Sequence, residues 1–406
     1  MKQILFLLSI YLTFYYFSFA QTAEEYVSRG NAKFEKGDFR GAIEDYTKAI
    51  EIKPNYAEAY FNRGKAEADL GGLRSAIEDF NKSIAINPNY AEAYFNRGKA
   101  EADLGDLRSA IEDFNKAIEI NPNYAEAYFN RGLAKGNLGD FRSAIEDFTK
   151  AIEINPNYAE AYFNRGLAKG NLGDFRSAIE DFTKAIEIKP NYAEAYNGRG
   201  NAKGDLGDFR SAIEDYTKAI AINPNDAEAY YNRGNTKVNL GDLRAAIEDY
   251  TKAIAINPNY EEAYYNRGVA KAKLGDLRAA IEDYTKAIAI NPNLAVAYNN
   301  RGNAKMNLGD FHAAIEDFNT AIAINPNLAV AYYNKGTAKL DLGYHLAAIE
   351  DFNKAIAINP NYVDAYINRG VAKYYLGDKF GACSDWSKAG ELGLKDAYDY
   401  IRKYCK

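Results

Sequence analysis

Residues 57–90 read AEAYFNRGKAEADLGGLRSAIEDFNKSIAINPNY, and residues 91–124 repeat this stretch with only three substitutions. The ten prolines of the 406-residue chain lie 34 residues apart, from Pro54 to Pro360. A fixed period of this length is the signature of an array of small supersecondary units. With the proline at position 32, the chain divides into eleven repeats, the last of which has Leu394 instead of proline: 23–56, 57–90, 91–124, 125–158, 159–192, 193–226, 227–260, 261–294, 295–328, 329–362 and 363–396.

Each repeat has the pattern of two helices joined by a turn. Small and apolar residues recur at helical spacing in both halves of residues 57–90. Gly71 is suited to end the first helix, because glycine adopts a left-handed conformation at little cost. Pro88 ends the second helix, because it has no N–H and disfavours helical geometry in the preceding residue. Gly64 is small where two helices approach, and we expect the Phe80 ring to fill the space. The sequence therefore predicts an all-α protein in which stacked hairpins share one core.

The repeat resembles the tetratricopeptide repeat family. The family pattern has an aromatic residue at position 4, Gly at 8, Ala at 20, an aromatic at 24, Ala at 27 and Pro at 32. It matches across residues 23–396, with Ser83 and Leu394 as the exceptions. The resemblance implies a right-handed superhelix, an α-solenoid, whose first helices line the concave face with positions 2, 5, 6, 9, 12 and 13. We expect residues 397–406 to form a C-terminal capping helix.

Charged residues occupy two positions that often face the neighbouring hairpin. Position 7 is arginine in most repeats, as in Arg63, and position 11 is lysine in nine repeats and glutamate in two. An enclosed guanidinium group needs a carboxylate or carbonyl partner. Aspartate is present at position 23 of every repeat. We therefore predict that Arg63 pairs with Asp45 or Asp79, and that equivalent pairs form a ladder along the array.

The composition argues against an enzyme, a metalloprotein and a nucleic-acid-binding protein. The chain has only two histidines and two cysteines, too few for zinc-cluster chemistry or much acid–base chemistry. His312 and His345 lie near the starts of second helices, where we interpret them as surface residues. The net charge of −6 gives no basic footprint for nucleic acid. We expect no catalytic residue, no metal and no cofactor.

Residues 1–20 have the pattern of a secretory signal peptide. Lys2 precedes an uncharged run, and the small residues Ser18 and Ala20 stand at the −3 and −1 positions of a cleavage site before Gln21. The alternative is an uncleaved anchor, because 18 uncharged residues nearly span a bilayer. We favour cleavage and predict an exported protein, periplasmic or extracellular, with no transmembrane segment after cleavage.

The concave face that the resemblance implies carries two ladders and a short apolar stretch. An asparagine amide can pair with an extended peptide backbone, and exposed aromatic rings suit side-chain pockets or sugar rings. The alternatives are local capping by the amides, packing by the rings and sequence drift at the valines. The basic residues of the family's carboxylate clamp are absent. The candidate binding residues are Asn62, Asn96, Asn130, Asn164, Asn232, Asn266, Asn300 and Asn334, then Phe61, Phe95, Phe129, Phe163, Tyr231, Tyr265 and Tyr333, and finally Val296 and Val330.

These features predict a non-catalytic scaffold or adaptor that binds a protein or peptide along its concave face. The alternative function is a glycan- or envelope-polymer-binding module that uses the aromatic and asparagine residues.

The only two cysteines, Cys383 and Cys405, lie in the terminal cap. In a hairpin that turns at Leu394, both are eleven residues from the turn, which brings facing Cα atoms within reach of a disulfide. Export to an oxidising compartment would allow the bond to form. The alternative is a pair of buried free thiols. We favour the disulfide.

Overall fold

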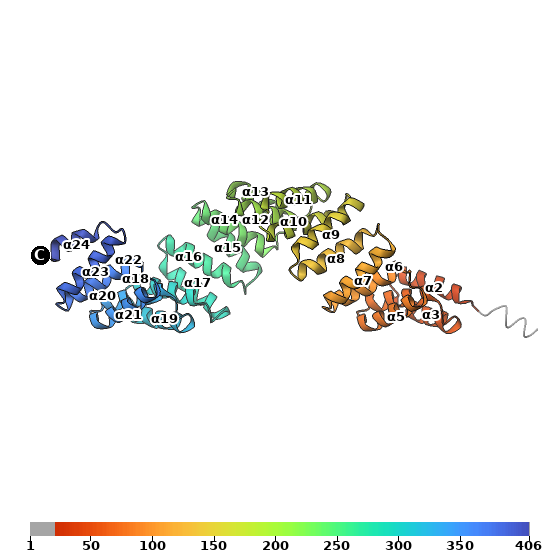
Figure 1. Ribbon diagram of the computed structural model, residues 1–406, viewed down its shortest axis with the longest axis horizontal. Coiled ribbons are helices and arrows are strands. Elements are labelled where there is room, and N and C mark those ends of the chain that lie inside the picture. The colour runs from red at the N-terminus through yellow and green to blue at the C-terminus, as the bar shows by residue number, and fades with distance from the viewer. Residues whose placement is uncertain (1–20, 406) are drawn as a thin grey trace, which may run out of the picture. The chain divides into compact units, whose positions relative to one another are not determined.

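The computed structural model describes residues 21–405, so the predicted signal peptide lies outside the described residues. These residues form helices and turns with no strand (Figure 1). The helices are α2 (Ala23–Glu35), α3 (Phe39–Ile52), α4 (Ala57–Asp69), α5 (Leu73–Ile86), α6 (Ala91–Asp103), α7 (Leu107–Ile120), α8 (Ala125–Asn137), α9 (Phe141–Ile154), α10 (Ala159–Asn171), α11 (Phe175–Ile188), α12 (Ala193–Asp205), α13 (Phe209–Ile222), α14 (Ala227–Asn239), α15 (Leu243–Ile256), α16 (Glu261–Lys273), α17 (Leu277–Ile290), α18 (Ala295–Asn307), α19 (Phe311–Ile324), α20 (Ala329–Asp341), α21 (His345–Ile358), α22 (Val363–Tyr375), α23 (Lys379–Glu391) and α24 (Ala397–Tyr404).

The chain divides into two compact units, Met1–Ala202 and Lys203–Lys406. We call them the N-terminal and C-terminal units. Within each unit the two helices of a repeat pack against each other, and the second helix packs on the first helix of the next repeat. The prediction of an all-α array of helix–turn–helix repeats is therefore confirmed.

The turn residues act as the sequence predicts. Helix α4 ends at Asp69, and Gly71 follows with φ 83°, a conformation that glycine adopts without strain. In the next repeat, the Asp106 carboxylate caps α7 by accepting a hydrogen bond from the Ser109 N–H at 3.2 Å. Helix α5 ends at Ile86, and Asn87 is extended before Pro88. The two helices of each repeat thus have defined ends, which fix the register of the array.

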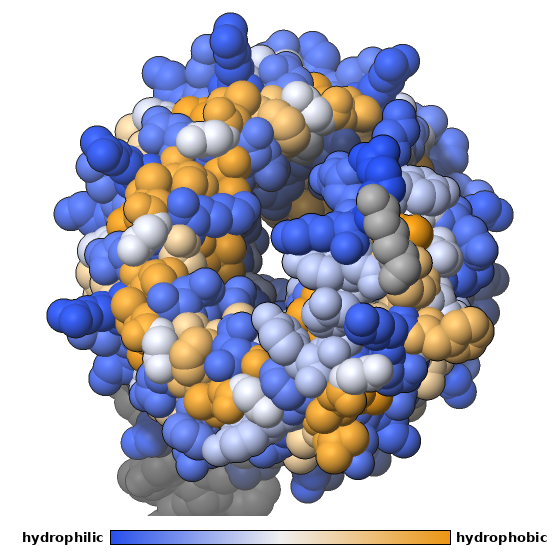
Figure 2. Space-filling model, turned by 90° about the vertical axis from the view of Figure 1, so that its left-hand side faces the viewer, coloured by the Kyte–Doolittle hydropathy of each residue, from blue (hydrophilic) through white to orange (hydrophobic). Residues whose placement is uncertain are grey.

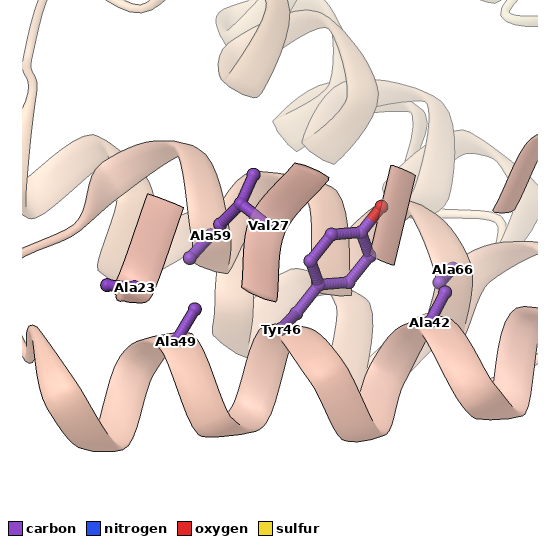
Figure 3. Close-up of a cluster of buried hydrophobic side chains, with 7 residues drawn as sticks. All are labelled: Ala23, Val27, Ala42, Tyr46, Ala49, Ala59 and Ala66. Carbon is purple, nitrogen blue, oxygen red and sulfur yellow. The ribbon is translucent and has the colours of Figure 1, made fainter. Parts of the chain in front are cut away.

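Alanines and one large ring per repeat build the core. In the first repeat the Tyr46 ring is 1 % exposed and lies between helices, with Ala42 and Ala49 on its own helix and Ala59 on the next repeat (Figure 3). Position 8 is glycine because the ring at position 24 leaves no room for a side chain. A Cβ on Gly64 would lie 2.9 Å from Cε1 of Phe80.

An ion-pair ladder joins the helices of each repeat. The Arg63 guanidinium donates to both carboxylate oxygens of Asp79 at 2.7 Å, so the prediction is confirmed with the aspartate of the same repeat. The remaining Arg63 nitrogen Nη1 donates to Thr47 Oγ1 of the preceding repeat at 3.1 Å. Where position 11 is lysine, its ammonium shares the aspartate. Lys135 Nζ lies 2.7 Å from Asp147 Oδ2. One buried carboxylate therefore holds two cations of the first helix.

The C-terminal repeat ends in a disulfide-bonded cap. The structure joins Cys383 on α23 to Cys405, the residue that follows α24, with their Cα atoms 5.9 Å apart. The buried Trp386 ring stacks on Tyr400, with the ring centroids 5.4 Å apart. The predicted capping helix 397–406 corresponds to α24.

Thiol titration tests this disulfide. The unreduced, denatured mature protein should show no free thiol, because both cysteines are bonded. Reduction should increase amide hydrogen exchange in α24 and leave α22 protected, because the bond constrains only the chain end. Cys383→Ser should reproduce the effect of reduction. Two free thiols in the unreduced chain would contradict the bond.

None of the helices within residues 21–405 has the length and apolar character needed to cross a membrane. Within the same residues, no three His, Cys, Asp or Glu side chains form a group that could hold a metal ion.

Candidate binding surface

In the N-terminal unit, the position-6 asparagines of three consecutive repeats behave alike. Asn96, Asn130 and Asn164 each donate through Nδ2 to the backbone carbonyl four residues earlier, at 2.7–2.8 Å. Their Oδ1 atoms have no hydrogen-bond partner within residues 21–405, and the three side chains are partly exposed. Since the donors are bonded within the helix, these amides offer acceptors to a ligand.

Asn62, in the second repeat, is engaged differently. Its Nδ2 donates to Asn31 Oδ1 at 3.1 Å, and the Tyr46 hydroxyl donates to the same oxygen at 2.8 Å. Asn62 therefore links two repeats rather than standing free.

In the C-terminal unit, the corresponding amides also join neighbouring repeats. Asn266 and Asn300 donate to the hydroxyls of Tyr231 and Tyr265 in the preceding repeats, both at 3.0 Å. Asn334 is buried and donates to Asn299 Oδ1 at 3.0 Å. Asn232 lies on α14 and is partly buried. The predicted amide ladder is thus not uniform, because several of its C-terminal members stabilise contacts between repeats.

The position-5 aromatic rings pack against neighbouring rings. The Phe95 ring centroid lies 4.8 Å from that of Tyr124 at position 34 and 5.9 Å from that of Phe114 at position 24. Phe61 is only 8 % exposed. The same arrangement recurs at Phe129, Phe163, Tyr231 and Tyr333, while Tyr265 packs on Tyr284. These rings contribute to the packing between helices and offer no broad free face for a sugar.

The two valines differ in exposure. Val296 on α18 is 40 % exposed, whereas Val330 on α20 is partly buried. On the side of the molecule shown in Figure 2, hydrophobic residues are interspersed with hydrophilic ones. His312 is exposed, but His345 is partly buried and stacks on Tyr375 with the ring centroids 4.9 Å apart. The surface interpretation therefore holds for His312 alone.

Pockets recur between first helices of neighbouring repeats. One of about 330 Å³ between α2 and α4 is lined by Asn31, Phe34, Lys65 and other residues. A pocket of about 130 Å³ between α4 and α6 includes Lys65, Asn96 and Lys99. In the C-terminal unit, a pocket of about 200 Å³ between α14 and α16 includes Asn266. A position-6 asparagine lines each of these three pockets: Asn62, Asn96 and Asn266.

The glutamates at position 2 were not among the candidate binding residues, but two of them form ion pairs between positions of one repeat. Glu160 pairs with Lys189 at 3.4 Å, and Glu24 pairs with Lys53 at 2.9 Å. Both lysines stand at position 31, where every other proline-containing repeat has asparagine. No cation of the described residues lies within ion-pair distance of Glu92 or Glu126, and both are exposed. The signal was present in the sequence as the single difference between the fourth and fifth repeats, Asn155 against Lys189.

Comparison with known families agrees with this architecture. A TPR repeat model matches residues 30–71, 64–105, 98–139, 204–241, 234–275 and 341–377, which together exceed half of the chain. The chain belongs to the tetratricopeptide repeat family. A second model, described as tetratricopeptide repeat, matches residues 125–158, 159–192, 261–294 and 295–328 of this TPR protein. No curated protein matches the sequence significantly.

Several solved structures are similar to parts of this TPR chain. The crystal structure of MamA is 35 % identical, covers 42 % of this chain and 94 % of its own, and has a TM-score of 0.39. YrrB, described as a TPR protein with an unusual peptide-binding site, is 27 % identical, with coverages of 47 % and 98 % and a TM-score of 0.43. The C-terminal part of a TPR protein from Cytophaga hutchinsonii is 21 % identical, with coverages of 59 % and 98 % and a TM-score of 0.50, a likeness of fold.

Proposed function

We propose that this TPR protein is an exported, non-catalytic scaffold that binds a protein or peptide along its first helices. The observation that carries the proposal is the set of three consecutive amides, Asn96, Asn130 and Asn164, at one position of successive repeats. Their donors are bonded within their own helices, and their acceptor oxygens bond to no other group of residues 21–405. An extended peptide backbone supplies N–H donors at regular spacing. Export rests on the predicted signal peptide and agrees with the disulfide in the cap.

Other functions have weaker support. Repeats that are nearly identical in sequence leave no unique niche for catalysis, and function on such copies belongs to a distributed surface. Sugar binding by stacking needs exposed ring faces. Here the position-5 rings pack against the aromatic rings at positions 24 and 34. This packing weakens the support for glycan binding, which needs ring faces open to a sugar.

Peptide selection with site-specific photo-crosslinking tests the proposal. A crosslinker at Leu167, 39 % exposed on the first helix α10, should capture peptides selected from a random extended library. One at the exposed Glu180 on α11 should not. Asn130→Ala with Asn164→Ala should weaken binding about tenfold, since each lost hydrogen bond contributes about 0.5–1.5 kcal/mol. Melting should remain nearly unchanged, because both amides bond within their own helices.

The matched control is Asn266→Ala with Asn300→Ala, which removes amides that link repeats. This variant should lower the melting temperature. Equal loss of stability in both double variants would show that the N-terminal amides are structural, and crosslinking from Glu180 alone would place binding elsewhere.

A further inference from the structure

Within residues 21–405, the two lysines at position 31 each contact a carboxylate and an aromatic ring. In the fifth repeat, Lys189 Nζ lies 3.4 Å from a Glu160 carboxylate oxygen and 4.4 Å from the centroid of the Tyr192 ring. In the first repeat, Lys53 Nζ lies 2.9 Å from Glu24 and 4.4 Å from the Tyr56 ring centroid. A carboxylate and the face of an aromatic ring are two groups that favour a cation. The glutamate at position 2 and the tyrosine at position 34 therefore form a binding site for an ammonium group, which we call the cradle. The lysine at position 31 occupies it in these two repeats.

The three repeats between them keep the cradle and lack the lysine. Each has glutamate at position 2, tyrosine at position 34 and asparagine at position 31. The fourth repeat differs from the fifth only in having Asn155 instead of Lys189. Its Glu126 is exposed and has no cation within ion-pair distance among residues 21–405, whereas the Glu160 side chain, with its lysine, is 45 % exposed. The fourth repeat thus has the glutamate and the tyrosine of the cradle but lacks the lysine that binds there in the fifth repeat.

The three sites that lack the lysine lie on consecutive repeats of the N-terminal unit. Burial raises the pKa of Tyr158 to about 12, and the charges of Glu126 and Glu160 raise it further in that direction. The pKa of Tyr90 is raised to about 12 by burial, with Glu58 and Glu92 acting on it from two repeats. The pKa of each of these two tyrosines is therefore raised by the position-2 glutamate of its own repeat and by that of the next repeat. The amides of Asn96 and Asn130 donate to the backbone carbonyls of Glu92 and Glu126, so each amide lies one helical turn from a position-2 glutamate.

We infer that the sites Glu58/Tyr90, Glu92/Tyr124 and Glu126/Tyr158 bind lysine side chains of a basic, extended partner segment. This inference rests on the proposed function and specifies its ligand. One exposed ion pair contributes only about 0–1 kcal/mol. Three sites at one-repeat intervals on a rigid array add their contributions within one ligand, which gives specificity for several lysines. The amide oxygens at position 6 accept backbone N–H groups of the same segment.

A fluorescein-labelled decamer of lysine, measured by anisotropy on the mature protein, tests this inference. It should bind, and binding should weaken as salt is raised. Asn155→Lys, which supplies in the fourth repeat the lysine of the fifth, should weaken binding about three- to fivefold, as expected for loss of one exposed pair. Lys189→Asn, which vacates the Glu160/Tyr192 site, should strengthen binding by a similar factor.

Two control variants separate site binding from general attraction between opposite charges. Glu146→Gln changes the charge as Asn155→Lys does, but on the exposed side of α9, and Arg176→Gln is the counterpart of Lys189→Asn on α11. Both should change binding less than 1.5-fold, roughly the effect of a distant screened charge. Equal effects of the site variants and their controls, or tighter binding of a glutamate decamer, would overturn the inference.

The two sets of experiments distinguish failure of the lysine-site inference from failure of the proposed scaffold function. If selected peptides crosslink from Leu167 and their affinity is unchanged by Asn155→Lys, the scaffold function is supported and recognition of lysine side chains is excluded. Absence of any crosslink from Leu167, together with lysine-decamer binding that responds to Asn155→Lys, would support the cation sites on α4, α6 and α8 and refute a peptide-binding surface that extends to α10.

Discussion

Replacing Asp147 by alanine should lower the free energy of unfolding of the N-terminal unit by about 2–3 kcal/mol, the largest effect of any single polar substitution in a repeat. Asp147 is buried and accepts from Arg131 at 2.5–2.9 Å, while Lys135 lies 2.7 Å away. Its loss leaves two cations facing each other without a carboxylate. The estimate is below that for a fully buried pair, because the Arg131 and Lys135 side chains are 17 % and 21 % exposed and retain some hydration.

Glu146→Ala is the matched control, because it removes an equal charge from the exposed neighbouring position of α9. It should change stability by less than about 0.5 kcal/mol. Urea denaturation measures both variants, and hydrogen exchange should locate the Asp147→Ala loss in α8 and α9 first, since repeats are stabilised by their nearest neighbours. A similar cost for the two variants would mean that net charge, rather than the shared carboxylate, stabilises the repeat.

The sequence predicted the helices and their ends because single residues decide them. Gly71 takes a positive φ at the turn, and the residue before Pro88 is extended. The pairing of position 7 with position 23 was also predictable, since an enclosed guanidinium accepts few partners. The roles of position 11 and of Glu160 were not anticipated, because long side chains on a surface reach several partners of similar energy.

The amides were the least predictable feature of the site. Asn130 bonds its own helix, and the preceding repeat has Phe95 at position 5. Asn266 instead bonds Tyr231, the position-5 residue of its preceding repeat. A tyrosine hydroxyl or an asparagine amide at position 5 therefore accepts a hydrogen bond from the position-6 asparagine of the next repeat. When position 5 is phenylalanine, that asparagine donates to a backbone carbonyl of its own helix instead. This dependence joins two positions 35 residues apart, which a reading of one repeat at a time does not detect.

The second large effect concerns pH. Position 11 is glutamate in the second and third repeats, where Glu67 and Glu101 replace the lysine that shares the position-23 aspartate. One carboxylate oxygen of each is enclosed and has no hydrogen-bond partner among residues 21–405. Burial, with a smaller contribution from Asp79, raises the pKa of Glu67 from 4.5 to about 7. Burial and Asp113 raise the pKa of Glu101 to about 7. On Glu67 the Arg63 charge acts in the opposite direction, and Glu78 from α5 adds to the increase.

A carboxyl group whose pKa is higher in the folded chain binds its proton more tightly there. Its stabilising contribution is complete below the unfolded pKa of 4.5 and is lost as the pH rises through about 7. The free energy of unfolding of the N-terminal unit should therefore fall between pH 5 and pH 8. Both side chains are partly exposed, so solvent screening limits the loss to about 1 kcal/mol for each glutamate.

Glu67→Lys combined with Glu101→Lys should remove this pH dependence and raise stability at pH 8, because it restores the ammonium that meets Asp147 in the fourth repeat at 2.7 Å. Glu112→Lys, a charge change of the same sign at an exposed position of α7, is the control and should leave the dependence in place. Urea denaturation at pH 5 and pH 8 compares each variant with the parent chain, which cancels the titration of all other groups. If the parent chain is as stable at pH 8 as at pH 5, or if the double lysine variant keeps the same pH difference, the two glutamates are ionised in the folded protein and the enclosed oxygens are solvated.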